Sequence, residues 1–447
     1  MSASAPMPLR TVVVGLGRTG LSVARFLVAH GVRVAITDSR ARPPELERVR
    51  ELGEDVVLRT GGFDAELLEH ADLVVVSPGV ALTGAFFDAA RARGLGIVGD
   101  IELFARAARA PVVGITGTNG KSTVTTLLAR MAAGAGIAMR VGGNLGAPAL
   151  ELLDSGAALY ILELSSFQLE TTESLALAAA TVLNVTPDHL DRYRNLAAYA
   201  AAKARIFARC DIAVINLDDP LVAAMPAPGQ RRLSFSLRAN VGADYALMRH
   251  DDGDWWLMRH DERLLAVSQM RLTGLHNAAN ALAALALGEA LALPRATCVA
   301  ALREFNGLEH RTQWVAEIDG VRYVNDSKGT NVGATLAAVA GMPGPLIVIA
   351  GGDGKGQDFA PLRAAFAGKV RATVLIGRDA HALGSALQGA SALHYAPSLP
   401  AAVERAAALA QPGDTVLLSP ACASLDMFRD YAQRGEVFAD AVHRRSA

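Results

Sequence analysis

Short apolar runs rich in valine and isoleucine alternate along the chain with longer stretches rich in alanine, leucine and arginine, whose apolar positions recur with the period of a helix. The short runs are typical of strands buried on both faces, and the longer stretches are typical of amphipathic helices. Because strands and helices alternate, the pattern predicts parallel sheets covered by helices. The fold class that we expect is therefore α/β.

The alternation falls into three blocks, which we predict to be three domains of residues 1–102, 103–307 and 308–447. At roughly 100–200 residues per domain, a chain of 447 residues accommodates that number. The expected strands are residues 11–14, 32–37 and 73–77 in the first block, 112–116, 159–164 and 213–216 in the second, and 322–325, 346–350, 373–376 and 415–418 in the third. The expected helices are residues 20–30, 122–133 and 278–292.

Composition and charge exclude several classes of protein. The net charge is −1, so the chain lacks the excess of basic residues that is typical of nucleic-acid-binding proteins. It also lacks a charged tail of the kind that binds membrane surfaces. The chain lacks a stretch of about 18 uninterrupted apolar residues, and its first residues lack the layout of a signal peptide. The 3 cysteines are odd in number and widely spaced, which suits a reducing compartment better than disulfides or zinc. We expect a cytoplasmic protein.

A glycine-rich segment, Pro-Val-Val-Gly-Ile-Thr-Gly-Thr-Asn-Gly-Lys-Ser-Thr at 111–123, lies between the expected strand and helix of the second block. We expect the chain to turn through Gly114, Gly117 and Gly120, so that backbone N–H groups and the helix N-terminus receive phosphate oxygens. Lys121 would add a positive charge at the phosphates, and Ser122 a hydroxyl for Mg²⁺. Thr116, Thr118, Asn119 and Thr123 complete the expected ATP-binding segment. The usual P-loop spacing requires glycine at position 115, which is isoleucine here, and this argues against a motor or GTPase.

Acidic and basic side chains at other element ends suggest a metal site. Glu163 ends the apolar strand 159–164, where a parallel sheet faces its ligand crevice, so it could hold Mg²⁺ with Ser122; the alternative is a solvated strand end. His189 lies between Asp188 and Asp191 and could be a second ligand. By composition alone, a hydrogen-bonded loop histidine is favoured.

The first block contains a sequence motif that is similar to that of dinucleotide-binding sites. Residues 15–20 read Gly-Leu-Gly-Arg-Thr-Gly after the first strand, and Asp38 ends the second strand. Taken by itself, this pattern predicts NAD binding. The same geometry, glycines at a helix N-terminus, suits any diphosphate.

Together these segments resemble the Mur ligase superfamily, which includes the folylpolyglutamate synthases. Its ATP loop reads Gly-x-Thr-Gly-Thr-Asn-Gly-Lys-Ser/Thr, as residues 114–122 do. The resemblance extends over the whole chain and is strongest to the D-glutamate-adding ligases. The further matching segments are residues 142–146, 163–170, 188–192, 199–203, 276–280, 309–311, 325–331, 351–355 and 418–426.

The resemblance implies a fold and an activity. It implies a Rossmann-like N-terminal domain that binds UDP, a central P-loop ATPase-type parallel-sheet domain, and a C-terminal Rossmann-like α/β domain that binds the amino acid. The implied enzyme is an ATP-dependent amide ligase that adds D-glutamate to UDP-N-acetylmuramoyl-L-alanine through an acyl phosphate, in cytoplasmic peptidoglycan precursor synthesis. We expect a monomer whose third domain closes over the substrates, without nucleic acid or membrane as partners.

The resemblance also implies roles for individual residues. Lys121, Asn144, His189 and Lys203 would be catalytic; Asn277, Asn280, Arg311 and Asp326 would extend the ATP site. UDP-substrate contacts would be Arg18, Thr19, Asp38, Ser39, Arg40, Ser77, Pro78, Gly79, Asn144 and His189. Lys328, Thr330, Lys355, Ser424, Leu425 and Tyr431 would form the D-glutamate pocket, with tyrosine where the family often has phenylalanine. Ser122 and Glu163 would hold one Mg²⁺, and His189 with a carbamylated Lys203 a second. Without the family, Lys203 would be interpreted as a surface helix lysine.

Three alternatives stay open at this point. A sibling ligase for another amino acid or a folylpolyglutamate synthase shares the ATP loop, but the folate enzymes lack the N-terminal domain and the chain has no Asp-Asn-Pro-Arg stretch of the diaminopimelate type. An NAD-dependent oxidoreductase would explain residues 15–20. An inactive ATP-binding scaffold is disfavoured by the intact set of Lys121, Glu163, His189 and Lys203.

Overall fold

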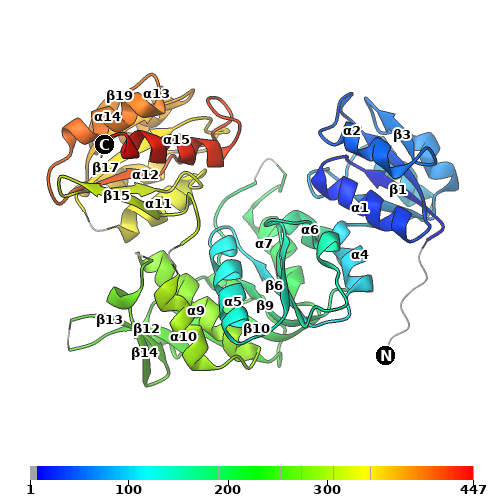
Figure 1. Cartoon of the computed structure of the whole chain (residues 1–447), viewed down its shortest axis with the longest axis horizontal. Helices are drawn as coiled ribbons and strands as arrows, with labels where there is room; N and C mark the ends of the chain where they lie inside the picture. The colour runs from blue at the N-terminus through cyan, green and yellow to red at the C-terminus, as the bar shows by residue number, and fades with distance from the viewer. Residues whose placement is uncertain are drawn as a thin grey trace. The chain divides into compact units, whose positions relative to one another are not determined.

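The computed structural model describes residues 8–189, 192–251, 253–272, 274–305, 307–342 and 344–445 (Figure 1). Asp191, expected beside His189, lies outside them. Contacts group the chain into two compact units. The first runs to Val185 and adds His189–Phe235 and Ala283–Cys298; the second comprises Thr186–Asp188, Ser236–Leu282 and the chain from Val299 onward.

The N-terminal part of the first unit is an open parallel sheet with the strand order β3-β2-β1-β4-β5. The strands are β1 (Arg10–Val14), β2 (Arg33–Asp38), β3 (Val57–Thr60), β4 (Leu73–Val76) and β5 (Gly96–Val98). The helices are α1 (Arg18–Ala29), α2 (Leu46–Val49), α3 (Ala85–Ala92) and α4 (Asp100–Ala107), with 3₁₀ turns η1 (Arg50–Leu52) and η2 (Ala65–His70). Val12 packs with Phe86 on one face of the sheet, and Val13 packs with Leu27 on the other. The predicted Rossmann-like arrangement is confirmed.

A second parallel sheet, ordered β11-β10-β9-β6-β8-β7, follows in the same unit. Its strands are β6 (Val112–Thr116), β7 (Met139–Gly143), β8 (Leu159–Glu163), β9 (Leu177–Val182), β10 (Cys210–Asn216) and β11 (Arg232–Ser236). The associated helices are α5 (Lys121–Gly134), α6 (Ser166–Glu170), α7 (Leu196–Ala204) and α8 (Pro220–Ala223), with η3 (Ala149–Leu152) and η4 (Arg205–Phe207). The chain passes from β6 toward β7 and β8, then crosses to β9 on the other side of β6. The carboxyl end of β6 is therefore the point where the strand order reverses, which is where ligands bind in such sheets.

The second unit also contains strands that lie outside the predicted parallel pattern. β12 (Tyr245–Arg249), β13 (Trp255–Arg259) and β14 (Glu262–Ala266) pair antiparallel. The connections between these strands are only a few residues long, whereas a parallel crossover needs about a dozen or more. The turns η5 (Ala239–Val241) and η6 (Val267–Gln269) flank this meander.

The predicted alanine-rich helix is confirmed as α9 (Leu275–Ala290), which is followed by α10 (Arg295–Glu304). Small side chains such as Ala281 and Ala284 are fully buried, so the alanines let neighbouring elements approach closely. Across the described ranges, no helix is both long enough and apolar enough to cross a membrane.

The C-terminal sheet has the order β15-β16-β20-β17-β18-β19, parallel except for the edge strand β15. Its strands are β15 (Gln313–Ile318), β16 (Val321–Asn325), β17 (Leu346–Gly351), β18 (Val370–Ile376), β19 (Ala392–Tyr395) and β20 (Thr415–Leu418). Its helices are α11 (Val332–Gly341), α12 (Ala360–Phe366), α13 (Ala380–Leu387), α14 (Leu399–Leu409) and α15 (Tyr431–His443). Val348 packs toward α11–α13 while Ile349 packs toward α14 and α15, so helices cover both faces (Figure 1).

Candidate active site

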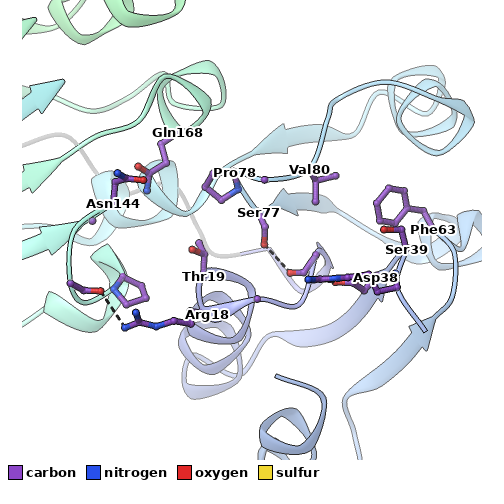
Figure 2. A pocket seen from close by; sticks show the side chains of 17 residues that line it. Arg18, Thr19, Asp38, Ser39, Phe63, Ser77, Pro78, Val80, Asn144 and Gln168 are labelled. Carbon is purple, nitrogen blue, oxygen red and sulfur yellow. Dashed lines mark hydrogen bonds and ion pairs between the residues drawn. The ribbon is translucent and has the colours of Figure 1, made fainter. Parts of the chain in front are cut away.

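A pocket of about 570 Å³ lies at the carboxyl ends of β1, β2 and β4 in the first unit (Figure 2). A volume of this size lies within the range of roughly 300–1,000 Å³ that small-molecule sites occupy. Its lining includes nine of the ten predicted UDP-substrate residues: Arg18, Thr19, Asp38, Ser39, Arg40, Ser77, Pro78, Gly79 and Asn144. The tenth, His189, is not among the lining residues. The structure thus gathers residues that the sequence separates by more than a hundred positions.

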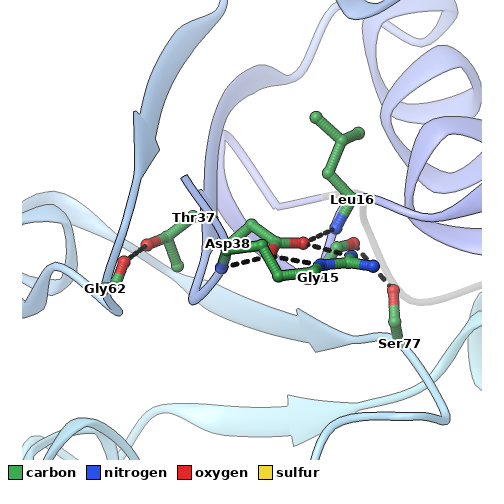
Figure 3. Close-up of polar contacts among 7 residues, drawn as sticks. Gly15, Leu16, Thr37, Asp38, Gly62 and Ser77 are labelled. Atoms are coloured by element: carbon green, nitrogen blue, oxygen red, sulfur yellow. Dashed lines mark hydrogen bonds and ion pairs between the residues drawn. The ribbon is translucent and has the colours of Figure 1, made fainter. Parts of the chain in front are cut away.

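The glycines at 15–20 build the floor of this pocket by close approach. A Cβ on Gly20 would lie 1.9 Å from the carbonyl oxygen of Gly15, so only glycine fits where α1 meets the strand end. Gly15 has a φ of +93°, which favours glycine. The hydroxyl of Ser77 donates to the Gly15 carbonyl oxygen at 2.8 Å and holds the loop from the β4 side (Figure 3). The N-terminus of α1, at Gly17 and Arg18, therefore opens into the pocket and suits a diphosphate.

Asp38 uses its carboxylate within the chain. One oxygen accepts from the Leu16 N–H at 2.7 Å and from Arg40, and the other accepts from the backbone and side chain of Arg40 (Figure 3). Burial acts to raise the pKa of Asp38, but the bonds from Arg40 and Leu16 outweigh it and hold the pKa below its ordinary value. A dinucleotide site needs this carboxylate for a ribose hydroxyl. The oxygens of Asp38 instead brace the glycine loop, which weakens the NAD interpretation.

Sequence reasoning missed several residues of this pocket. Phe63, on the loop after the unpredicted strand β3, and Val80 supply its apolar wall. Gln168, at the start of α6, lies beside Asn144 and Pro78 in Figure 2. The remaining unpredicted lining residues are Gly15, Gly17, Gly143, Gly146 and Pro148. For Phe63 the only signal was the preceding Gly-Gly pair, and for Gln168 it was the matching segment 163–170.

The second glycine-rich loop follows β6. Gly117 has a φ of +153° and Gly120 a φ of +85°, and α5 begins directly afterwards at Lys121. The expectation that the chain also turns at Gly114 is wrong, because Gly114 lies within β6. A Cβ there would lie 2.9 Å from Leu177 Cδ1 and 3.1 Å from Ile206 Cδ1, so this glycine serves the packing of the sheet.

Asn184, a residue without a predicted role, clamps the phosphate loop. Its carbonyl oxygen accepts from the Thr118 N–H, and its side-chain oxygen accepts from the Asn119 N–H at 2.8 Å. Two of the N–H groups expected to face phosphate therefore brace the loop instead. The Nζ of Lys121 donates to the carbonyl oxygens of Gly117 and Thr118 at 2.8 and 2.9 Å, which places the ammonium over the loop.

Glu163, at the end of β8, joins the two halves of the site. Its Oε2 accepts from the Ser122 hydroxyl at 2.6 Å, and its Oε1 accepts from the Asn144 Nδ2 at 2.7 Å. Glu163 is only 3% exposed, so the alternative of a solvated strand end is excluded. A hydroxyl and a carboxylate this close form the hard oxygen pair that suits Mg²⁺. Because Asn144 also lines the pocket, Glu163 links the pocket to the glycine-rich loop through Asn144 on one side and Ser122 on the other.

Lys203 is buried, so the interpretation of a surface lysine is wrong. It is 1% exposed, its Nζ donates to the Gly117 carbonyl oxygen at 3.0 Å, and the ammonium lies 4.5 Å from the ring centre of Tyr199. The ring of His189 lies 6.1 Å from that of Tyr199 and 5.0 Å from that of Phe167. Lys203 and His189 thus flank one tyrosine behind the phosphate loop. The side chains that the structure describes contain no group of three or more histidine, cysteine or acidic ligands for a metal.

Five of the six predicted D-glutamate residues come from three neighbouring loops of the C-terminal sheet, in which β20 lies between β16 and β17. Lys328 and Thr330 follow β16, Lys355 follows β17, and Ser424 and Leu425 follow β20. The last two loops are tied together by paired backbone hydrogen bonds between residues 353 and 423.

Tyr431, where the family often has phenylalanine, begins α15 and underlies Lys328. The Nζ of Lys328 lies 3.7 Å from the centre of the Tyr431 ring, close enough for a cation–π contact. Ser424 is buried, whereas Leu425 is 69% exposed. The contact with Lys328 is made by the aromatic ring of Tyr431 and does not need its hydroxyl.

The other predicted nucleotide residues lie in the second unit. Asn277 and Asn280 are buried on α9, where the Nδ2 of Asn280 donates to the Asn277 side-chain oxygen at 3.3 Å. Burial raises the pKa of Asp326 to about 6, although Ser419 and Thr312 donate hydrogen bonds to it and Arg311 lies near. Whether these residues touch ATP stays a prediction.

Models of known protein families match three successive parts of the chain. Three family models match it: a Mur ligase MurD-like N-terminal domain over residues 9–99, a Mur ligase middle domain over 115–288, and a Mur ligase glutamate ligase domain over 310–422. The boundaries predicted at 102 and 307 stay predictions.

Curated relatives share more than half of the sequence. The chain is 55% identical to a UDP-N-acetylmuramoylalanine–D-glutamate ligase of Nitrosococcus oceani, over 97% of this chain and 96% of the relative. A protein of the same name from Methylobacillus flagellatus is 52% identical over the same shares.

Solved structures share the fold at low identity. A pseudomurein peptide ligase type C from Methanothermus fervidus is 16% identical with a TM-score of 0.63, over 97% of this chain and 99% of that one. The UDP-N-acetylmuramate-alanine ligase MurC from Thermotoga maritima is 19% identical with a TM-score of 0.61, over 98% and 100%. From the three family models and the near-full-length identity to curated relatives, the chain belongs to the Mur ligase family.

Proposed function

We propose that this protein is an ATP-dependent ligase that joins the amine of D-glutamate to the alanyl carboxylate of UDP-N-acetylmuramoyl-L-alanine. The observation that carries the proposal is the hydrogen-bonded set of Ser122, Glu163 and Asn144. One end of this set belongs to the phosphate loop and the other lines the pocket that suits a nucleotide diphosphate. The names of the relatives supply the sugar and the amino acid.

The reaction needs an activated carboxylate, because a free carboxylate is a poor electrophile. The alanyl carboxylate oxygen attacks the γ-phosphorus of ATP, and the bond between this phosphorus and the β-phosphate oxygen breaks. The products of this step are an acyl phosphate and ADP. The amine of D-glutamate then attacks the acyl carbon, loses a proton, and expels inorganic phosphate. The protein has to position the reactants and neutralise charge, roles that we assign to Lys121 and the N-terminus of α5.

Mur ligases use ATP and Mg²⁺, and the oxygens of Ser122 and Glu163 fit one such ion. When bound, the metal would withdraw charge from the phosphate oxygens. We also propose a second metal site at His189 and Lys203. A bare ammonium would repel a cation, so Lys203 would act there as a carbamate formed with CO₂. Its burial beside Gly117, next to the Tyr199 ring that His189 also approaches, supports this assignment.

The substrate assignments extend to the other domains. We assign residues 1–102 to UDP, 103–307 to ATP and 308–447 to D-glutamate. Lys328 and Lys355, on neighbouring loops, supply two cations for a dicarboxylic amino acid. ATP and nucleotide sugars are available in the cytoplasm, where we place the reaction, and we expect the enzyme to act as a monomer.

Release of inorganic phosphate tests the proposal. We expect release only when ATP, UDP-N-acetylmuramoyl-L-alanine and D-glutamate are all present, with one amide formed per ADP. A panel of D- and L-amino acids, including L-lysine and diaminopimelate, separates this ligase from its siblings, and a folate substrate tests the folylpolyglutamate alternative. Phosphate release without the UDP-substrate, or consumption of NADH, would refute the proposal.

A further inference from the structure

Arg434, on the first turns of α15, is a fully buried arginine of the C-terminal domain. It is 0% exposed and is the largest of the fully buried side chains. Its Nε donates to the Ser327 hydroxyl at 3.0 Å, its Nη2 to the Ser327 carbonyl oxygen at 2.7 Å, and its Nη1 to the Cys422 carbonyl oxygen at 3.1 Å. The planar fork of the guanidinium therefore holds two separate backbone segments in fixed positions.

The two segments are the loops that carry most of the predicted amino-acid pocket. Ser327 lies in the loop after β16, directly before Lys328, and Cys422 lies in the loop after β20, two residues before Ser424. The strands β16 and β20 are hydrogen-bonded neighbours, with Asn325 opposite Leu418, so both loops leave the same edge of the sheet.

Ser327 extends this connection to the start of α15. Its hydroxyl donates to the carbonyl oxygen of Tyr431 at 2.7 Å, and the ring of Tyr431 underlies the ammonium of Lys328. The Arg434 guanidinium thus supports both loops and, through Ser327, the aromatic residue beneath Lys328.

If Arg434 only filled space in the core, an apolar side chain would do so at a lower cost in folding free energy. Burying a charge costs several kcal/mol unless its donors are satisfied, and well-packed hydrophobic residues often replace buried ions without loss of stability. Burial lowers the pKa of Arg434 to about 10, with Asp426 and Asp326 acting in the opposite direction, so the group stays charged near neutral pH. The sequence therefore keeps a buried cation directly behind the loops that would receive a dicarboxylate.

We infer that Arg434 is a positioning residue for the amino-acid substrate, setting the spacing of the loops after β16 and β20 and adding positive potential beneath them. This inference rests on the proposed function, because the loops are assigned to D-glutamate there. Arg434 does not touch the substrate; it acts through Ser327 and the backbone at Cys422.

Steady-state kinetics of three variants test this role. Arg434→Met removes both the planar guanidinium and the charge, and Arg434→Lys keeps the charge alone. Ser327→Ala removes the hydroxyl that accepts from Arg434 Nε and donates to the Tyr431 carbonyl oxygen, while the guanidinium keeps its bonds to the carbonyl oxygens of Ser327 and Cys422. Val442→Ala, two turns along α15 in the core, is the matched control for loss of packing. We expect the KM for D-glutamate to rise on the order of 10- to 100-fold in Arg434→Met, less in Arg434→Lys and least in Ser327→Ala. The KM values for ATP and the UDP-substrate should stay within about twofold.

A merely structural arginine would give a different result. The variants would then lose kcat in proportion to their unfolded fraction, as Val442→Ala would, with an unchanged KM for D-glutamate; that result would overturn the inference. If neither Arg434 variant folds, Ser327→Ala decides, because an unchanged KM for D-glutamate there would also overturn it. Failure of the proposed function is distinguishable, since the wild-type protein itself would then release no phosphate in response to D-glutamate.

Discussion

The substitution Glu163→Gln tests the proposed Mg²⁺ site with almost no change in shape. In the wild type, the carboxylate accepts one bond from Ser122 and one from Asn144 while 3% exposed. A glutamine can keep both contacts, because its carbonyl oxygen can face the Asn144 amide while its NH₂ group donates to the Ser122 hydroxyl. The variant should therefore fold, but it lacks the anionic oxygen that a cation needs.

The expected change in stability is small. A hydrogen bond to a charged acceptor contributes about 1.5–3 kcal/mol and one to a neutral acceptor about 0.5–1.5 kcal/mol. Two such exchanges at Glu163 would lower the free energy of unfolding by about 2–3 kcal/mol, which is offset because the variant no longer buries a charge at a cost of several kcal/mol. We expect a net change within about 2 kcal/mol, and a rise of at least 10- to 100-fold in the free Mg²⁺ needed for half-maximal rate.

The assay is phosphate release at saturating substrates while free Mg²⁺ is varied, alongside thermal unfolding of the same preparations. Glu151→Gln makes the same chemical change at an exposed residue of the 3₁₀ turn η3 and serves as the control. If Glu163→Gln is folded and its Mg²⁺ dependence matches that of Glu151→Gln, Glu163 is not a metal ligand and our interpretation of the Ser122–Glu163 pair is wrong.

Three further predictions follow from individual contacts. Gly20→Ala would place a Cβ 1.9 Å from the Gly15 carbonyl oxygen, so the KM for the UDP-substrate should rise on the order of 10-fold or more while the KM for ATP does not. Burial raises the pKa of Asp100 from 3.8 to about 6, so its stabilising contribution is complete below pH 3.8 and is lost as pH rises through 6. Asp100→Asn should remove up to about 3 kcal/mol of that pH dependence in unfolding experiments. Lys203→Arg keeps a cation that cannot be carbamylated, so in buffer with bicarbonate its activity should lie at least about 10-fold below that of the wild type, with the fold retained. Wild-type activity should fall toward that of the variant when CO₂ is removed; wild-type activity that stays unchanged in CO₂-depleted buffer would exclude the carbamate.

The buried parallel strands were the most predictable part of the fold. Runs such as 112–116, which is apolar up to Thr116, and 346–350, which is apolar throughout, reflect that both faces of a parallel sheet are covered, and both became strands. The meander β12–β14 was missed because its strands mix exposed and buried positions, as in Trp255–Arg259, and because its pairing depends on short turns. Strand β3 was missed for a similar reason, since its residues are mostly exposed.

The candidate site was predictable where backbone geometry restricts the residue type. Glycine is required at position 20 because the Gly15 carbonyl oxygen approaches closely, and at position 120 because φ is positive. Such requirements leave a recognisable glycine pattern in the sequence. Asn184 and Arg434 left none, because a polar side chain that braces a distant loop looks like any polar residue until the fold brings the loop to it. Their roles depend on tertiary contacts that spacing along the chain does not encode.

The first unit contains two glycine-rich loops, each between a strand and a helix. The hydrogen-bond partners of the neighbouring acid, Asp38 or Glu163, determine which ligand each loop suits. At the first loop, Asp38 accepts bonds from a backbone N–H and a guanidinium, and these partners fix the loop permanently. At the second loop, Glu163 accepts from a hydroxyl and an amide, neutral donors that can be exchanged for a cation at low cost. A carboxylate already neutralised by arginine cannot ligate a metal without breaking an ion pair, whereas Glu163 can. The first loop is therefore suited to holding a diphosphate, and the chemistry belongs at the second.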